Sequence, residues 1–294
     1  MPETKPKLSI IVISFQMQRE LPRTLYSLTE EYQKDISAND YEVIVVDNGT
    51  TNFDHNLATR FGPQFISLPS PVQSHSPVDA INFGISRAQA PLIGVMIDGA
   101  RICSPGILSN ALRASRMGSD SVIGTMGFHL GPEVQMKSVL DGYCQASEDE
   151  LLDSIDWQKN GYALFDISVL AGSSARGFYQ PIAESNAVFL SKEKWRELGG
   201  YDSAFSSPGG GYTNLDLWKR ACASSKTPPI ILISEGTFHQ VHGGIATNGS
   251  HAQRQSFQDE YVKVKGENFT PPDYEPIWYG VPHAHVRRFL DSGK

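Results

Sequence analysis

The sequence is poor in cysteine and in charged residues. Its three cysteines, Cys103, Cys144 and Cys222, lie far apart in 294 residues. An odd, sparse set of this kind is neither a disulfide framework nor a zinc finger, and it is typical of a reducing compartment. Charged residues make up 19% of the chain and the net charge is −7. Because nucleic-acid-binding proteins usually carry a basic surface, this balance argues against nucleic acid as a partner.

Long apolar runs and several well-known catalytic motifs are also missing. No segment approaches the roughly 20 apolar residues of a membrane span, so we expect at most peripheral membrane association. Ser14-Phe-Gln-Met-Gln18 stands where a dinucleotide-binding G-x-G-x-x-G would follow the first apolar segment. The chain has no G-x-x-x-x-G-K-[ST], H-E-x-x-H or G-x-S-x-G. These absences disfavour nicotinamide-dependent oxidoreductases, ATPases, zincins and α/β-hydrolases.

The first part of the chain alternates apolar segments with amphipathic ones. Strands are expected at Leu8–Phe15, Tyr41–Asp47, Phe65–Leu68, Leu92–Asp98 and Ser121–Gly124, and helices at Glu20–Tyr32, Val78–Ala88 and Ile107–Arg116. This close alternation predicts an α/β fold with a mostly parallel central sheet flanked by helices. Ligands of such sheets bind beyond the carboxyl ends of the strands, where Asp47 and Asp98 stand.

The alternation stops near residue 126. Residues 127–182 are rich in glycine and predict an irregular segment with one helix, around Ser147–Trp157, of the kind that forms a lid or a binding loop. Further strands are expected at Asn186–Ser191 and Ile230–Ile233, and further helices at Lys192–Leu198, Thr213–Ala223 and Ser250–Lys265. We therefore expect two halves of one domain, residues 1–125 and 126–245, followed by a C-terminal helix and wrapping arm over residues 246–294.

Four polar residues have two interpretations each. Asp98 either contacts a ribose hydroxyl or a hard cation, or caps the next helix. Asp47 either binds a base or ribose, or forms the turn of Asp47-Asn-Gly. His239 and His242 are three residues apart, and one of them either joins Asp98 around a divalent ion or is a satisfied polar side chain.

A glycine-rich turn precedes the expected helix at Thr213–Ala223. Asp216 and Arg220 lie four residues apart in that helix, which is the spacing of a surface ion pair. Alternatively, the helix start presents an acid or an amide to a cleft, where the positive end of the helix dipole keeps an acid ionised.

Taken in order, these segments resemble family 2 glycosyltransferases with the GT-A fold, over roughly residues 8–245. The resemblance rests on Leu8–Gln16 (the opening strand and P-T-Y-N turn), Tyr41–Gly49 (E-V-I-V-V-D-N-G-S), Ala80–Gly84 (A-R-N-x-G), Met96–Ala100 (D-x-D), Leu198–Phe205 (L-G-G-F-D-E-x-F) and Thr213–Arg220 (E-D-x-D-L-x-x-R). It implies a GT-A domain with the C-terminal helical and irregular extension described above.

The resemblance also implies a nucleotide-sugar site. Its residues would be Ser14, Phe15, Gln16, Asp47, Asn82, Asp98 and Arg101, with Asp98, His242 and His239 around a divalent cation, manganese or magnesium. Ala100 replaces the second aspartate of D-x-D, and Asn214 replaces the usual catalytic base. Asp216, the nearest remaining acid, is the first candidate for the base, and Glu184 and Asp202 are the others.

The expected activity is that of an inverting glycosyltransferase. It would move a sugar from a nucleotide-diphosphate donor to a hydroxyl of a glycan or lipid-linked acceptor, in surface polysaccharide or glycolipid synthesis. A cytoplasmic location, including the inner face of the membrane, is expected with it. The alternative is a non-catalytic relative that binds nucleotide or glycan and has lost the base, as Ala100 and Asn214 would allow. A nucleotidyltransferase is disfavoured because no Gly-rich, basic phosphate loop follows the first strand.

Overall fold

One ten-stranded sheet organises the chain. The computed structural model describes residues 5–243 and 251–290. The strands are β1 (Leu8–Ser14), β2 (Tyr41–Asp47), β3 (Phe65–Pro69), β4 (Leu92–Met96), β5 (Arg101–Cys103), β6 (Ile123–Leu130), β7 (Ser168–Leu170), β8 (Ala187–Ser191), β9 (Ile230–His239) and β10 (Ile277–Tyr279). Their order is β10-β9-β6-β8-β4-β1-β2-β3, with β5 on β9 and β7 on β6. β8 runs antiparallel to both of its neighbours, whereas β3, β2, β1 and β4 are mutually parallel.

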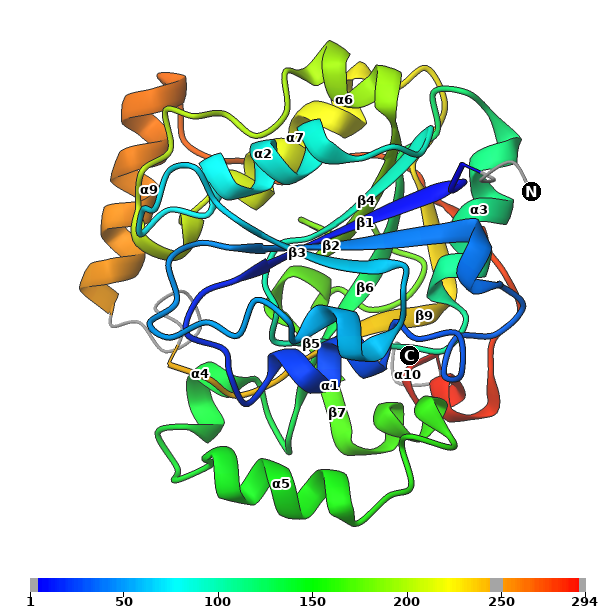
Figure 1. Ribbon diagram of the computed structural model, residues 1–294. Helices are drawn as coiled ribbons and strands as arrows, with labels where there is room; N and C mark the ends of the chain where they lie inside the picture. The colour runs from blue at the N-terminus through cyan, green and yellow to red at the C-terminus, as the bar shows by residue number, and fades with distance from the viewer. Residues whose placement is uncertain (1–4, 244–250, 291–294) are drawn as a thin grey trace.

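Helices cover both faces of the sheet (Figure 1). They are α1 (Leu21–Tyr26), α2 (Val78–Arg87), α3 (Ile107–Ala114), α4 (Gln135–Ser138), α5 (Gln145–Asp153), α6 (Lys192–Leu198), α7 (Thr213–Ser224), α9 (His251–Lys265) and α10 (Arg287–Leu290). Alternate residues of β1 enter two separate cores, because successive side chains of a strand point to opposite faces. Ile11 belongs to the core that contains residues of α2, α6 and α7, whereas Ile10 belongs to the core that contains residues of α1 and α3. The predicted α/β architecture is confirmed.

Three expected elements differ from the structure. The helix expected over Glu20–Tyr32 ends at Tyr26, and the hydroxyl of the next residue, Ser27, accepts the N–H of Cys103 in β5. The segment 127–182, expected to be largely irregular, contains the end of β6, α4, α5 and β7. β9 continues to His239 instead of ending at Ile233. The sequence pattern missed this continuation because Glu235 interrupts the apolar run. In the structure its carboxylate is buried and accepts hydrogen bonds from four donors, so the strand continues through it.

The predicted halves of the domain share the sheet. β6 crosses the boundary expected at residue 125, and the boundary expected at residue 245 lies outside the described residues. Tyr162 and Phe165, in the segment expected to act as a lid, are buried and anchor it to the core. The C-terminal arm adds β10 to the edge of the sheet, parallel to β9. Within the described residues, no helix is both long and apolar enough to cross a membrane.

Gly94 in β4 is expected to tolerate no side chain. A Cβ atom there would lie 2.6 Å from the ring of Phe189 and 2.9 Å from Ile10. Because overpacking of a filled core forces neighbours from their rotamers, Gly94→Ala is expected to lower the free energy of unfolding by about 1–3 kcal/mol. Urea denaturation measures the difference. Gly172→Ala is the control, since a Cβ atom at Gly172 meets nothing within 4 Å. Equal stability of the two variants would contradict this account of the β4–β8 contact.

Candidate functional site

A cleft lies beyond the carboxyl ends of β1 and β4. Its cavity volume is about 330 Å³. It is lined after β1 by Phe15, Gln16 and Met17, after β4 by Ile97, Asp98 and Arg101, at or after the end of β9 by His239, His242 and Gly243, and on the far side by His75, Pro77, Pro208 and Gly209. This is where an open α/β sheet is expected to bind its ligand.

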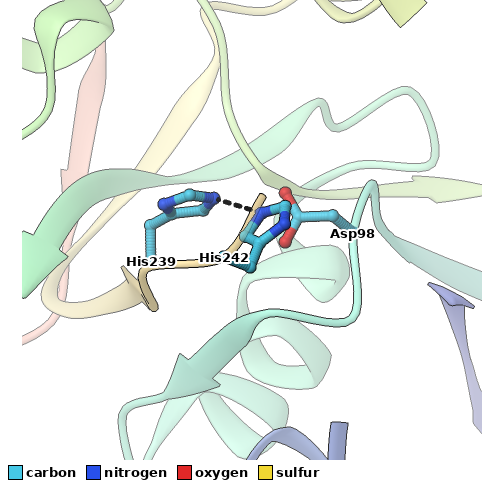
Figure 2. Close-up of side chains that lie close together, drawn as sticks. All are labelled: Asp98, His239 and His242. Carbon is cyan, nitrogen blue, oxygen red and sulfur yellow. Dashed lines mark hydrogen bonds between the residues drawn. The ribbon is translucent and has the colours of Figure 1, made fainter. Parts of the chain in front are cut away.

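Asp98, His239 and His242 gather on one wall of this cleft (Figure 2). One ligand atom from each residue lies within 4.8 Å of those of the other two. The Nε2 atoms of the two imidazoles are 3.1 Å apart. Chain topology produces the cluster, because β5, which follows Asp98, pairs with β9 and sets Arg101 opposite His239.

The chemistry of this trio fits a divalent cation. Burial lowers the pKa of His239 well below its ordinary value and also lowers that of His242. Both imidazoles are therefore neutral at pH 7, the form that ligates metals. Two neutral imidazoles and one carboxylate form an accepted ligand set for a transition-metal ion. The structure thus brings together all three metal-ligand candidates of the sequence.

Arg101 places an unused donor beside the trio. Its Nε donates to the Oδ2 atom of Asp98 at 2.8 Å. The Arg101 side chain is buried, and its Nη1 atom has no hydrogen-bond partner among residues 5–243 and 251–290. Because an unpaired buried donor is costly, this atom is suited to an incoming anionic ligand such as a phosphate.

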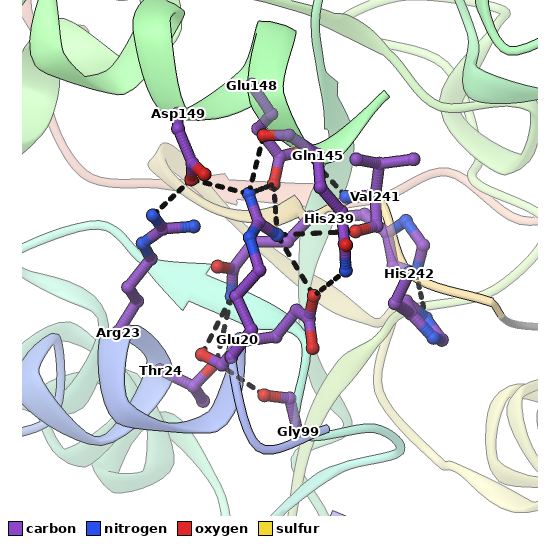
Figure 3. A network of polar contacts seen from close by, with 12 residues as sticks. Glu20, Arg23, Thr24, Gly99, Gln145, Glu148, Asp149, His239, Val241 and His242 are labelled. Atoms are coloured by element: carbon purple, nitrogen blue, oxygen red, sulfur yellow. Dashed lines mark hydrogen bonds and ion pairs between the residues drawn. The ribbon is translucent and has the colours of Figure 1, made fainter. Parts of the chain in front are cut away.

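A polar network holds the loop that carries His242 (Figure 3). The Oε2 atom of Glu148 in α5 accepts the backbone N–H of Val241 at 2.6 Å. Arg19 donates to the carboxylates of Glu148, at 3.3 Å, and of Glu20, at 2.9 Å. Helix α5 is thereby tied both to the start of α1 and to the residue before His242. The segment expected to be a lid therefore supports the loop of the candidate cation site from outside.

Replacing Glu148 by glutamine is expected to flatten the pH dependence of stability. Burial raises the pKa of Glu148 from 4.5 to about 7. Between these values the folded protein retains a proton that the unfolded chain has released, so the free energy of unfolding falls as pH rises, by about 3 kcal/mol in total. Chemical denaturation of both proteins at several pH values between 4 and 8 measures this loss.

Asp149 in the same helix provides the control. Its burial is outweighed by hydrogen bonds from Arg23 and Arg19, so its pKa is lowered. Its stabilising effect is lost only as pH falls through that lowered pKa, and Asp149→Asn should keep the decline seen above pH 4.5. An identical decline in the wild type and in Glu148→Gln would contradict the interpretation.

Glu184, one of the candidates for the base, contacts Asn214, the residue that stands in place of the usual base. Its Oε2 atom accepts from the amide of Asn214 at 2.8 Å. Asn214, the second residue of α7, accepts from the hydroxyl of Tyr201 at 3.1 Å. Desolvation raises the pKa of Glu184, with Arg101 opposing and Asp98 reinforcing this effect through their charges. Glu184 therefore belongs to the electrostatic neighbourhood of the cleft.

Asp216 and Asp202 lie elsewhere. Asp216 forms ion pairs with Arg220 at 2.7 Å and with Lys265 at 3.0 Å. Asp202 pairs with the same Lys265 at 2.7 Å. Neither residue lines the cleft, and together they tie α7 and the Asp202 loop to α9. The structure thus gives Asp216 the ion-pair role. Glu184 does not line the cleft either, but the charges of Asp98 and Arg101, which do, act on its carboxylate.

The structure places only some of the predicted nucleotide-binding residues in the cleft. Phe15 and Gln16 line the cleft, whereas Ser14 lines a neighbouring cavity of about 150 Å³, and its buried hydroxyl has no partner in the described part of the chain. Asp47 is buried and accepts the N–H of Thr50 at 3.0 Å, as a turn former does. Asn82 is bound through both side-chain atoms to the backbone of Tyr201, away from the cleft.

Sequence reasoning missed the residues that support the site. Gln135 and His129 contact each other and flank His239, and Arg19 and Glu148 hold the His242 loop. Only His129 carried a signal: it lies in β6 opposite His239 in β9, a register that a longer β9 would have revealed. The others depend on contacts between segments more than 90 residues apart, and no local pattern encodes those contacts.

Comparison with solved structures finds the same fold in glycosyltransferases. S. aureus TarS superimposes with a TM-score of 0.52 and 14% identity, over 98% of this chain and 42% of TarS. Mannosyltransferase PcManGT from Pyrobaculum calidifontis, in complex with GDP-Man and Mn²⁺, superimposes with a TM-score of 0.54 and 14% identity, over 91% of this chain and 66% of PcManGT. TarS 1–349 in complex with UDP-GlcNAc superimposes with a TM-score of 0.51 and 13% identity, over 98% of this chain and 71% of that fragment. The chain therefore spans less than half of TarS and about two thirds of PcManGT.

Comparison with curated protein sequences finds no match. A comparison with protein families, in contrast, matches the profile described as Glycosyl transferase family 2 over residues 9–181. This match covers β1 to β7 and Asp98, and it accounts for more than half of the chain. Together with the shared GT-A fold, it confirms the resemblance noted in the sequence: the chain belongs to glycosyl transferase family 2.

Proposed function

We propose that the protein is an inverting glycosyltransferase that moves a sugar from a nucleotide-diphosphate donor to an acceptor hydroxyl. The observation that carries the proposal is the single cleft that combines the Asp98–His239–His242 trio with the unpaired Nη1 atom of Arg101. Membership of the family supports it. So do the GDP-Man, Mn²⁺ and UDP-GlcNAc of the structural relatives. The acceptor we propose is a glycan or lipid-linked sugar of surface polysaccharide or glycolipid synthesis, as the family resemblance implies.

The donor side would be formed by the strand ends. Asp98, His239 and His242 would hold a divalent cation, which when bound neutralises negative charge on the departing diphosphate. Arg101 would donate the N–H of its unpaired Nη1 atom to a diphosphate oxygen. Phe15 is 38% exposed at the cleft and offers a ring face to the base of the nucleotide.

Glu184 would act as the general base. Its carboxylate would accept the proton of the acceptor hydroxyl as the oxygen attacks the sugar carbon and the bond to the diphosphate breaks. A raised pKa makes the carboxylate a stronger proton acceptor, provided that it is ionised at the working pH. Asn214 cannot take a proton, and its amide would orient the Oε2 atom of Glu184.

A donor screen tests the proposal. Thermal unfolding is measured with a panel of uridine, guanosine, cytidine, thymidine and adenosine diphosphate sugars, with and without Mn²⁺. A donor that raises the melting temperature in the presence of Mn²⁺, and that the protein then transfers or hydrolyses, supports the enzyme. Donor binding without transfer or hydrolysis across a broad acceptor panel would favour the non-catalytic relative. A panel without any stabilising donor would overturn the proposal.

A further inference from the structure

Gln135, the first residue of α4, contacts two histidines from complete burial. Its backbone N–H donates to the Nδ1 atom of His129 at 2.9 Å. Its side-chain Nε2 donates to the backbone carbonyl of His239 at 2.9 Å. Its Oε1 atom lies 2.6 Å from the Nδ1 atom of the same histidine. One residue therefore contacts both the backbone and the ring of a member of the cation trio.

These contacts determine the tautomer of His239. A backbone carbonyl only accepts hydrogen bonds, so the side-chain atom of Gln135 that faces it must be the NH₂ group. The other side-chain atom must then be the carbonyl oxygen, which also only accepts. The Nδ1 atom of His239 must therefore carry the proton, and the Nε2 atom of the neutral ring keeps its lone pair. That lone pair lies on the side of His242 and Asp98.

The neighbouring His129 has the opposite tautomer. Because its Nδ1 atom accepts the backbone N–H of Gln135, its proton is on Nε2. The rings of His129 and His239 are 5.4 Å apart, yet only His239 belongs to the trio. Gln135 thus distinguishes a ligand from a non-ligand in a pair of adjacent histidines.

We propose that Gln135 is a positioning residue that fixes His239 as a nitrogen ligand, and that the resulting site prefers transition-metal ions to Mg²⁺. The inference rests on the proposed function only in sharing its cation site. A ligating histidine that donates its other N–H to a fixed acceptor is oriented and made more basic. Two imidazoles and one carboxylate suit ions such as Co²⁺ or Zn²⁺, whereas Mg²⁺ prefers oxygen ligands and its own water molecules.

Titration of the full-length protein with Co²⁺, without nucleotide, tests the proposal through the visible absorption of the ion. We expect saturable binding that a 100-fold excess of Mg²⁺ does not displace. Gln135→Leu should weaken Co²⁺ binding about 10–100-fold, as loss of a residue supporting a metal ligand does. Gln135→Glu should weaken Co²⁺ binding less than Gln135→Leu does, since its carboxylate still accepts the Nδ1 proton although it no longer donates to the His239 carbonyl. The ¹⁵N chemical shifts of the His239 ring should report a protonated Nδ1 in the wild type and a mixture of tautomers in Gln135→Leu.

Two controls separate positioning from simple destabilisation. Gln33→Leu removes another buried glutamine that binds backbone groups of distant segments, and it should leave Co²⁺ affinity unchanged. In the His239→Ala background, Gln135→Leu should cause no further loss of Co²⁺ affinity, because the two changes remove the same interaction between Gln135 and His239. The proposal fails if Gln135→Leu binds Co²⁺ within three-fold of the wild type, if its effect persists without His239, or if equimolar Mg²⁺ displaces Co²⁺. Because no sugar donor is used, a failure of the proposed transfer activity leaves these results unaffected.

Discussion

Glu184→Gln is expected to lower the turnover of sugar transfer by roughly 10²–10⁴-fold, the usual contribution of a general base. Glutamine keeps the shape of the side chain and an oxygen that accepts from Asn214, but it cannot take a proton. Donor affinity should change little, because Glu184 would act on the acceptor hydroxyl. The measurement is kcat with saturating donor beside the donor Kd, once the screen has identified the donor.

The control and the rescue both use the neighbourhood of α7. Asp216→Asn should retain turnover near that of the wild type, since its carboxylate is committed to Arg220 and Lys265. Asn214→Asp in the Glu184→Gln background should recover part of the lost turnover, because it restores one carboxylate at the same contact. Wild-type turnover in Glu184→Gln, or an equal loss in Asp216→Asn, would contradict the assignment of the base.

Asp98→Ala is expected to weaken donor binding in the presence of Mn²⁺ about 100-fold or more, equivalent to about 3 kcal/mol. The change removes the carboxylate of the cation trio and releases Arg101, whose Nε it holds at 2.8 Å. Calorimetric titration with the donor measures the loss. Asp202→Asn, which alters an aspartate outside the cleft, should bind the donor as the wild type does. Unchanged donor affinity in Asp98→Ala would exclude the strand-end site.

The edge of the sheet where the candidate cleft lies was predictable from the sequence. Apolar runs that end in polar residues placed Asp98 correctly, because the carboxyl ends of parallel strands meet at one edge. His239 and His242 were found as a spaced pair, although the length of β9 was not. A periodic pattern predicts a strand, but a buried polar residue such as Glu235 breaks the pattern without ending the strand.

The identity of the proposed base was harder to predict from the sequence. Two residues along a helix correspond to about 200° of rotation, so Asn214 and Asp216 face different surroundings. The spacing in the sequence shows that Asp216 and Asn214 point in different directions, but not what Asp216 contacts. That depends on Lys265 of α9, which forms an ion pair with Asp216. Likewise, Asn82 and Asp47 sit at family motif positions, yet their polar atoms bind the backbone of Tyr201 and Thr50. Only tertiary contacts decide between such uses of one polar side chain.

The antiparallel direction of β8 places the proposed base near the proposed donor site. Because β8 is antiparallel to β4, its beginning and the end of β4 meet at one edge, where Met96 pairs with Ala187. Asp98 follows that rung by two residues, and Glu184 precedes it by three. The pairing of β4 with β8 therefore sets the separation between Asp98 on the proposed donor side and Glu184, the proposed base. An acceptor would have to fit this spacing to be used.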